Sequence, residues 1–245
     1  MTRTASALSA LQRGGLAVLV DPARATPIGA AELARRAAGE GAVAILIGNS
    51  FGATRTIAAL SERMREEAPD LPVIQFPATA AQLDASVDAV LFLSLVSGRN
   101  PQYLIEEHVR AVPFVERHPE VEIISTAYCL IDGGRVSSVE AVSQTRPLPP
   151  DKPELVAAHV RAASLIGMRA IYLEAGSGAA RAVSPPLIRA ARANAAGPLL
   201  VGGGVRTPEA VRAARDAGAD VVVVGTLFEH GGTRAVRALA LAART

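Results

Sequence analysis

The segment GPLLVGGGVRTPEAVRAARDAGADVVVVGT, residues 197–226, contains the pattern that decides the fold. Its two short apolar runs, 198–201 and 221–224, have the composition of strands that are buried on both faces. Between them, Thr207 and Pro208 are typical N-cap and first helical residues, and they predict a helix over 208–217. Strand, helix and strand in this order predict a βαβ unit of a parallel sheet.

The same alternation extends over the rest of the chain. Six further apolar runs predict strands at 16–20, 43–47, 73–76, 89–93, 121–126 and 170–173. Further helices are predicted at 57–67, 101–112, 153–166, 185–195 and 234–243. Eight strands in this length favour an α/β fold of the (β/α)8 TIM barrel class. An open doubly wound sheet is the alternative, but GGGVRT lacks the spacing of the dinucleotide fingerprint.

Two connections depart from a regular barrel. The stretch between Phe76 and Asp88 is too short for a full crossover helix, so the third helix is predicted to be missing or irregular. The stretch 132–150 contains paired glycines, paired serines and three prolines, which predict a hairpin-like excursion and a long loop.

Composition limits the class of protein. The chain has 245 residues, of which 50% are hydrophobic and 20% charged, and we interpret residues 1–245 as a single TIM-barrel domain. No apolar run approaches the roughly 20 residues of a membrane span. A net charge of +2 gives no electrostatic reason to expect a nucleic-acid partner. One cysteine and no signal-peptide pattern predict a cytoplasmic protein.

Polar and glycine-rich residues follow the predicted strands, at the end of a barrel where active sites lie. Gly203 and Gly204, before the helix that starts at Pro208, and Gly225 with Thr226 indicate a phosphate site built from backbone amides. The alternative is that these glycines only make tight turns.

Two carboxylates also stand at strand ends. Asp21, with a hydroxyl such as that of Ser50, suits the oxygen preference of Mg²⁺, although a turn-capping role explains Asp21 equally well. Tyr172 and Glu174 are two residues apart and therefore point to the same side of their strand. There Glu174 could accept a proton from a bound hydroxyl, or instead pair with an arginine.

The remaining reactive side chains favour structural roles. His108, His118, His159 and His230 are scattered without the spacing of metal ligands. Cys129 lies in an apolar run, where packing is the better interpretation than nucleophilic catalysis.

Several segments together resemble a known family. YLEAGSGA (172–179), GGGVRTPE (202–209) and AGADVVVVGT (217–226) are similar to motifs of the geranylgeranylglyceryl phosphate synthases, a family that includes bacterial heptaprenylglyceryl phosphate synthases. FLSLVSGRNPQYLIEEHV (92–109) and STAYCLIDGG (125–134) follow the order of that family. The resemblance covers nearly the whole chain.

The resemblance implies a modified TIM barrel without a regular third helix, acting as a prenyltransferase. Such an enzyme forms an ether between a polyprenyl diphosphate and the C3 hydroxyl of sn-glycerol 1-phosphate, with Mg²⁺. Asp21 and Ser50 would bind the metal, and Glu174 would be the catalytic base. The residues implied to hold glycerol phosphate are Tyr172, Leu173, Glu174, Ala175, Gly176, Ser177, Gly178, Gly203, Gly204, Gly225 and Thr226.

The chain differs from the common family pattern at Gly48, Asn49 and Ser50, and at Ser97 and Gly98. Alternatives therefore stay open: prenyl transfer to 3-phosphoglycerate as in moenomycin-type biosynthesis, a phosphate-sugar isomerase or aldolase, or a phosphoglycerol-binding protein without catalysis. The expected partners are small molecules, and a peripheral membrane contact for product release and a homo-oligomeric state are also open.

Overall fold

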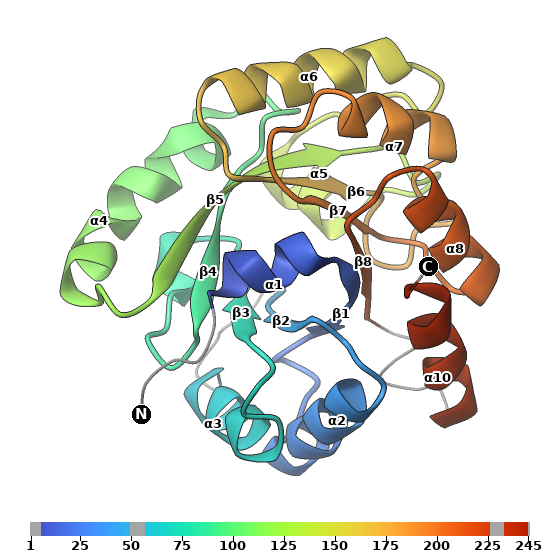
Figure 1. Cartoon of the computed structure of the whole chain (residues 1–245). Helices are drawn as coiled ribbons and strands as arrows, with labels where there is room; N and C mark the ends of the chain where they lie inside the picture. Colours follow the sequence, from blue (N-terminus) through green and yellow to red (C-terminus); the bar gives the residue numbers. More distant parts are fainter. Residues whose placement is uncertain (1–5, 50–56, 226–232, 245) are drawn as a thin grey trace.

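The strands form a closed parallel barrel. The computed structural model describes residues 6–49, 57–225 and 233–244, and its eight described strands follow one another around the ring (Figure 1). Leu16 of the first strand lies opposite Val222 of the last, which closes the barrel and confirms the predicted fold class. The strands are β1 (Gly15–Val20), β2 (Ala44–Ile47), β3 (Val73–Gln75), β4 (Ala89–Ser94), β5 (Glu122–Leu130), β6 (Ala170–Glu174), β7 (Leu199–Gly202) and β8 (Val221–Val224).

Helices surround the barrel (Figure 1). They are α1 (Ala7–Arg13), α2 (Pro27–Gly39), α3 (Ile57–Glu67), α4 (Glu107–Arg117), α5 (Ser138–Ser143), α6 (Pro153–Leu165), α7 (Pro185–Arg192), α8 (Pro208–Asp216) and α10 (Thr233–Ala242), with a π-helical turn η2 (Gln102–Glu106) before α4. Helices α1, α2 and α5 were not predicted from the sequence. For α2 a signal was present, because Thr26 accepts a hydrogen bond from the Gly29 amide at 3.1 Å and Pro27 is the first helical residue.

Buried side chains form two layers. Alternate strand residues such as Leu46, Leu91 and Tyr172 fill the barrel interior. Their neighbours, such as Ile45 and Leu173, pack outward against the helices. Both faces of the strands are therefore apolar, which explains why they read as continuous hydrophobic runs.

The connection between β3 and β4 contains no regular helix, which confirms the prediction that the third helix is missing or irregular. Between β3 and β4 there is only a 3₁₀ turn, η1 (Ala80–Gln82). Two buried amides take the place of helical packing: Gln75 Nε2 donates to the Gln82 carbonyl at 2.5 Å, and Gln82 Oε1 accepts from the Ala78 amide at 2.6 Å. The ring of helices is thus interrupted beside β3 and β4.

The excursion after β5 differs from the prediction. β5 runs to Leu130 rather than ending near Thr126, because its last residues pair with β6 as far as Glu174. The hairpin-like interpretation was wrong. The stretch contains α5, which Ser137 caps by accepting from the Glu140 amide at 3.1 Å, and a parallel bridge between Ile131 and Leu148.

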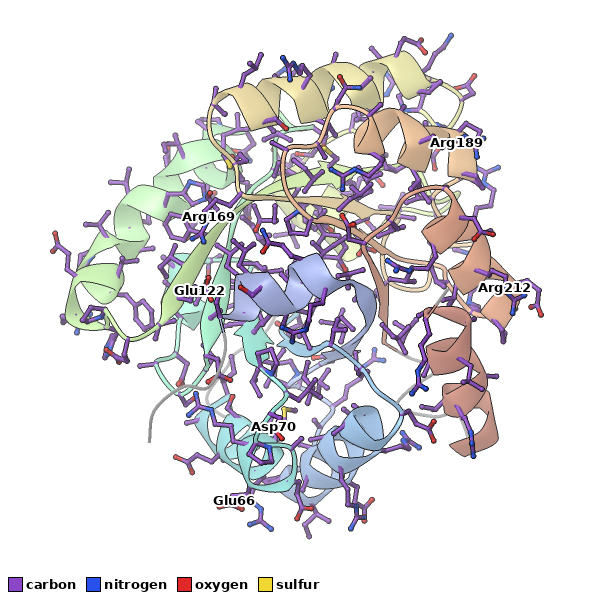
Figure 2. The ribbon with its side chains drawn as sticks, viewed as in Figure 1. Glu66, Asp70, Glu122, Arg169, Arg189 and Arg212 are labelled. Atoms are coloured by element: carbon purple, nitrogen blue, oxygen red, sulfur yellow. The ribbon has the colours of Figure 1, made fainter. Side chains whose placement is uncertain are left out.

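Helix α1 lies across the centre of the ring of strands and closes one end of the barrel (Figure 1). Its buried residues Ala7 and Leu11 join the interior cluster. Glu122, at the start of β5, accepts from the Ser6 hydroxyl at 2.9 Å and from the Ala7 amide at 2.7 Å. Glu122 and Arg169 lie beside α1 (Figure 2), with Arg169 Nη2 3.6 Å from the carboxylate. One carboxylate therefore anchors the first helix.

We expect Glu122→Ala to destabilise the protein by about 1 to 3 kcal/mol, because it leaves the first amides of α1 without their charged acceptor. Thermal and urea unfolding measure the loss. Glu116→Ala, an exposed glutamate on α4, is the matched control and should change stability by less than about 0.5 kcal/mol. Equal stability of the two variants would show that Glu122 does not hold α1.

Candidate active site

A cavity of about 550 Å³ with both polar and apolar lining opens at the carboxyl ends of the strands, where barrel enzymes place their chemistry, and we call it the polar cavity because Asp21 and Glu174 line it. Its lining comes from most of the strand-end loops, so residues distant in sequence converge there. The described residues that line it are Leu19, Asp21, Arg24, Gly48, Asn49, Phe76, Tyr128, Ser137, Ser138, Val139, Tyr172, Glu174, Gly176, Ser177, Gly178, Gly203, Gly204, Val205, Arg206, Val223, Val224 and Gly225.

Glu174 ends β6 and is only 6% exposed. The Gly176 amide donates to Glu174 Oε1 at 2.6 Å. Burial raises the pKa of Glu174 to about 7, although the Gly176 amide opposes the rise by stabilising the charged form. No ion pair of Glu174 with an arginine occurs among the described residues. A carboxyl that titrates near neutral pH at the wall of a cavity is suited to accept and release a proton.

The side chains of Tyr172 and Glu174 lie on the face of β6 that is turned toward the barrel interior, as the alternation of side chains along a strand predicts. Leu173 and Ala175 point the other way and belong to the outer apolar layer. Neither lines the cavity, so the structure does not bring these two predicted side chains into the site. Any contact of Leu173 or Ala175 with a ligand would have to use the backbone.

The glycine loops after β6 and β7 lie against each other. A Cβ atom added to Gly203 would lie 2.3 Å from Glu174 Oε1 and 2.6 Å from the Gly176 amide nitrogen, and Gly203 has a φ of +80°. Only glycine fits this close approach. Gly204, Gly176, Ser177 and Gly178 complete the two loops in the cavity wall.

Helix α8 begins directly after these glycines. Thr207 caps it, accepting from the Ala210 amide at 3.2 Å, as the sequence predicts. Arg206, which sequence reasoning missed, lines the cavity and ties the loops together by donating from Nη2 to the Ala179 carbonyl at 2.7 Å. Gly225 lines the cavity from the end of β8, while Thr226 lies outside the described residues. The glycine backbone at the start of α8 and an arginine make this side of the cavity suited to a phosphate.

Asp21 lies on the opposite wall, at the end of β1. Its Oδ1 accepts from the Ala23 amide at 3.0 Å, the turn-capping contact, and from Asn49 Nδ2 at 3.1 Å. Arg24 Nε lies 3.6 Å from Oδ2. Asp21 therefore caps its turn and also faces the cavity, so the two interpretations of this residue do not exclude each other.

The oxygen atoms near Asp21 fit Mg²⁺. Asn49 Oδ1 is buried and has no hydrogen-bond partner among the described residues, while Nδ2 of the same amide is the atom that contacts Asp21. This oxygen is a hard donor of the kind that Mg²⁺ prefers. Ser50, the other predicted ligand, lies outside the described residues. Within the described part of the chain, no three His, Cys, Asp or Glu side chains gather as a metal cluster. This donor set matches Mg²⁺, which keeps water and substrate oxygens as ligands.

A second cavity, about 90 Å³ and mostly apolar, adjoins the first. We call it the apolar groove. It lies beside the connection from β3 to β4, which has no regular helix, and between the 76–83 segment, β4 and α4. Its described lining residues are Asn49, Phe76, Pro77, Ala78, Thr79, Ala80, Leu83, Leu91, Phe92, Leu93, Leu95, Tyr103, Glu107, His108, Ala111, Tyr128, Val139, Val142 and Ser143.

Among the residues that the structure describes, the other reactive side chains do not build a site of their own. His108 Nε2 lies 2.8 Å from the Leu93 carbonyl, and its ring stacks on Phe92. Burial raises the pKa of Cys129 to about 12, so it is a thiol packed in the core, as predicted. His118 contacts Glu120 and His159 contacts the Leu155 carbonyl. His230 lies outside the described residues.

Comparison with known proteins identifies relatives over nearly the whole chain. The model of the PcrB family matches residues 11–243. A geranylgeranylglyceryl phosphate synthase of Korarchaeum cryptofilum is 41% identical over 221 residues, covering 90% of this chain and 89% of its own. One from Zunongwangia profunda is 40% identical over 216 residues, covering 88% and 91%.

A solved structure agrees with these relatives. It is (S)-3-O-geranylgeranylglyceryl phosphate synthase from Thermoplasma acidophilum in complex with its substrate sn-glycerol-1-phosphate. The two folds superpose with a TM-score of 0.89 at 29% identity, covering 97% of this chain and 96% of the other.

Proposed function

The chain belongs to the PcrB family, and from this membership and the site we propose that it is a Mg²⁺-dependent prenyltransferase. It joins a polyprenyl diphosphate of geranylgeranyl type to the C3 hydroxyl of sn-glycerol 1-phosphate through an ether bond. The observation that carries the proposal is the meeting of an apolar groove with a polar, glycine-walled cavity at the end of one barrel. A prenyl chain and a phosphorylated acceptor need these two environments side by side.

The apolar groove supports the assignment of the donor. Leucine, alanine and aromatic side chains of the 76–83 segment, β4 and α4 line it. A regular helix between β3 and β4 would cover the apolar groove, so its absence leaves room for a hydrocarbon chain. Burial of the chain there would supply binding energy of roughly 25 cal/mol per Å² of apolar surface.

The polar cavity supports the assignment of the acceptor. Its phosphate would accept hydrogen bonds from the amides around Gly203, Gly204 and Gly225, with Ser177 and Arg206 nearby. Glu174, between these glycines and the barrel interior, would then face the acceptor hydroxyl.

The reaction follows from these placements. The bond between C1 of the prenyl chain and the diphosphate oxygen breaks, and its electron pair leaves with the diphosphate. A lone pair of the acceptor C3 oxygen forms the new C–O bond, and the hydroxyl proton passes to Glu174. Asp21, Asn49 and Ser50 would hold Mg²⁺, which when bound neutralises negative charge on the diphosphate.

Product analysis tests the proposal against its alternatives. The protein and Mg²⁺ are incubated with labelled sn-glycerol 1-phosphate, sn-glycerol 3-phosphate or 3-phosphoglycerate and with prenyl diphosphates from geranyl to heptaprenyl. We expect an ether of sn-glycerol 1-phosphate. An ether of 3-phosphoglycerate would establish the alternative acceptor. With no ether from any pair, an isomerase, an aldolase or a binding protein without catalysis would replace the proposal.

The hydrophobic product also needs a way out. Among the described helices, none combines the length and hydropathy that a membrane span requires. Ile105, Val109 and Val112 are 56%, 64% and 46% exposed on η2 and α4, the elements that also line the apolar groove. This exposed face supports contact with a membrane surface for product release by an enzyme that we propose to be a single-domain, cytoplasmic protein.

Gly203→Ala is expected to raise the KM for glycerol phosphate about tenfold or more, with a smaller effect on the KM for the prenyl diphosphate. The new Cβ would collide with Glu174 and with the amides that face the phosphate. Gly167→Ala is the matched control, because Gly167 has a φ of +90° but no atom within 4 Å of an added Cβ. If only the KM for the prenyl diphosphate rises, the two subsites are reversed.

A further inference from the structure

The two cavities meet at a narrow set of residues. Asn49, Phe76, Tyr128 and Val139 are the described residues that line both, and we call them the throat. On the groove side the throat borders apolar side chains, and on the other side it borders Asp21 and Glu174. A molecule with its chain in the groove and its polar end in the cavity would therefore lie beside these four residues.

Aromatic rings are concentrated at this place. The chain has five phenylalanines, three tyrosines and no tryptophan. Phe76, Tyr128 and Tyr172 form one cluster, with ring centroids 6.0 Å apart for Phe76 and Tyr128 and 5.2 Å apart for Phe76 and Tyr172. The Tyr128 and Tyr172 rings meet edge to face at 5.6 Å.

The cluster holds its rings in place. Tyr172 is fully buried and packs against both other rings, so it supports them from the barrel interior. Phe76 follows β3 in the segment that the Gln75 and Gln82 amides fix. Burial raises the pKa of Tyr128, so its ring stays a neutral phenol. Two uncharged rings therefore border both cavities without needing to move.

We propose that Phe76 and Tyr128 are catalytic residues whose rings stabilise the positive charge that develops on C1 of the prenyl donor. This inference rests on the proposed function. With the chain in the groove and the acceptor hydroxyl at Glu174, C1 lies in the throat when its bond to the diphosphate oxygen breaks. The electron pair leaves with the diphosphate, and the allylic cation forms against the rings. The acceptor oxygen then bonds to C1 and its proton passes to Glu174.

The chemistry of the throat agrees with this role. A cation in an apolar surrounding is poorly solvated, and the negative face of an aromatic ring attracts it without competing as a nucleophile. Water would capture the cation, whereas the hydrocarbon side chains of Phe76 and Val139 cannot. The rings act only when charge has developed, so they favour the transition state over the neutral chain.

A fluorinated series at position 76 tests the proposal. Monofluoro-, difluoro- and trifluorophenylalanine keep the shape of Phe76 while they progressively weaken its attraction for a cation. We expect the single-turnover rate of ether formation to fall stepwise, by about tenfold in total, while the KM values of both substrates stay nearly constant. Phe76→Leu is expected to lose about 30-fold, which corresponds to about 2 kcal/mol at 1.36 kcal/mol per factor of ten.

The controls separate this inference from the proposed function. Phe114 is the matched control, because its ring packs on His118 and lines neither cavity. The same fluorinated series at position 114, and Phe114→Leu, should leave the rate unchanged. A flat series at position 76 in an enzyme that makes the ether overturns the role of the ring and leaves the proposed function intact. Absence of ether from the wild-type protein overturns the proposed function itself.

Discussion

Asp21→Ala is expected to abolish Mg²⁺-dependent ether formation, with a loss of at least about 10³-fold, while the barrel stays folded. Asp21 is the carboxylate that faces the cavity from β1, and Asn49 lies beside it with a buried oxygen atom. The variant loses the charge that would hold the cation near the diphosphate. Turnover over a range of Mg²⁺ concentrations, measured together with thermal unfolding, checks both parts of the expectation.

Asp132 offers a matched control for this variant. Its Oδ1 accepts from the Gly134 amide at 2.7 Å, which is the same local turn contact that Asp21 makes with Ala23. Asp132 does not line the polar cavity. We therefore expect Asp132→Ala to show a similar change in thermal stability and full turnover. Comparable activity in the two variants would limit Asp21 to capping its turn.

The sequence predicted the barrel because its signals are local. Each buried strand is a short apolar run, and helix starts such as Thr207 and Pro208 are readable from neighbouring residues. Helix α1 was missed although Ser6 is a local N-cap, and the further anchor of this helix, Glu122, lies more than a hundred residues along the chain. The 132–150 stretch was misread because turn-forming residues at its ends do not reveal the short helix capped by Ser137.

Prediction of the site was also limited to features that are visible within one short segment of the sequence. Glu174 and Gly203 could be proposed from the sequence, because strand-end positions and glycine runs are visible in one segment, and the structure places both in the wall of the cavity. Asn49 and Arg206 were not predicted to line the cavity, because their contacts, with Asp21 and with the Ala179 carbonyl, join segments that only the folded barrel brings near. Arg24 was also missed, although it lies only three residues from Asp21 and their contact is local. The throat could not be predicted at all, since Phe76 follows β3 whereas Tyr128 lies in β5, about fifty residues further along the chain.

Glu174→Gln is expected to lower the rate of ether formation by about 10²- to 10⁴-fold, with binding of glycerol phosphate largely kept. The amide has nearly the same shape and can still accept the hydrogen bond from the Gly176 amide, but it cannot take the hydroxyl proton. The pKa of Glu174 is about 7, so the wild-type rate should fall about tenfold for each pH unit below 7 as the base is protonated. Single-turnover rates against pH measure this limb, and the variant should lack it.

Above pH 7 the Glu174→Gln variant should be more stable than the wild type although it is slower, and this contrast separates a catalytic from a structural role for Glu174. Burial raises the pKa of its carboxyl from 4.5 to about 7, so the folded state prefers the protonated form. As pH rises through this interval the group therefore costs stability, up to about 3 kcal/mol above pH 7.

The side-chain amide of the Glu174→Gln variant carries no charge at any pH, so the variant should unfold at a higher temperature than the wild type at pH 8 and at the same temperature near pH 4. A variant that is both slower and less stable at pH 8 would mean that the carboxylate supports the fold rather than the chemistry. A slower but more stable variant is the result expected of a base that the barrel keeps buried at the expense of its own stability.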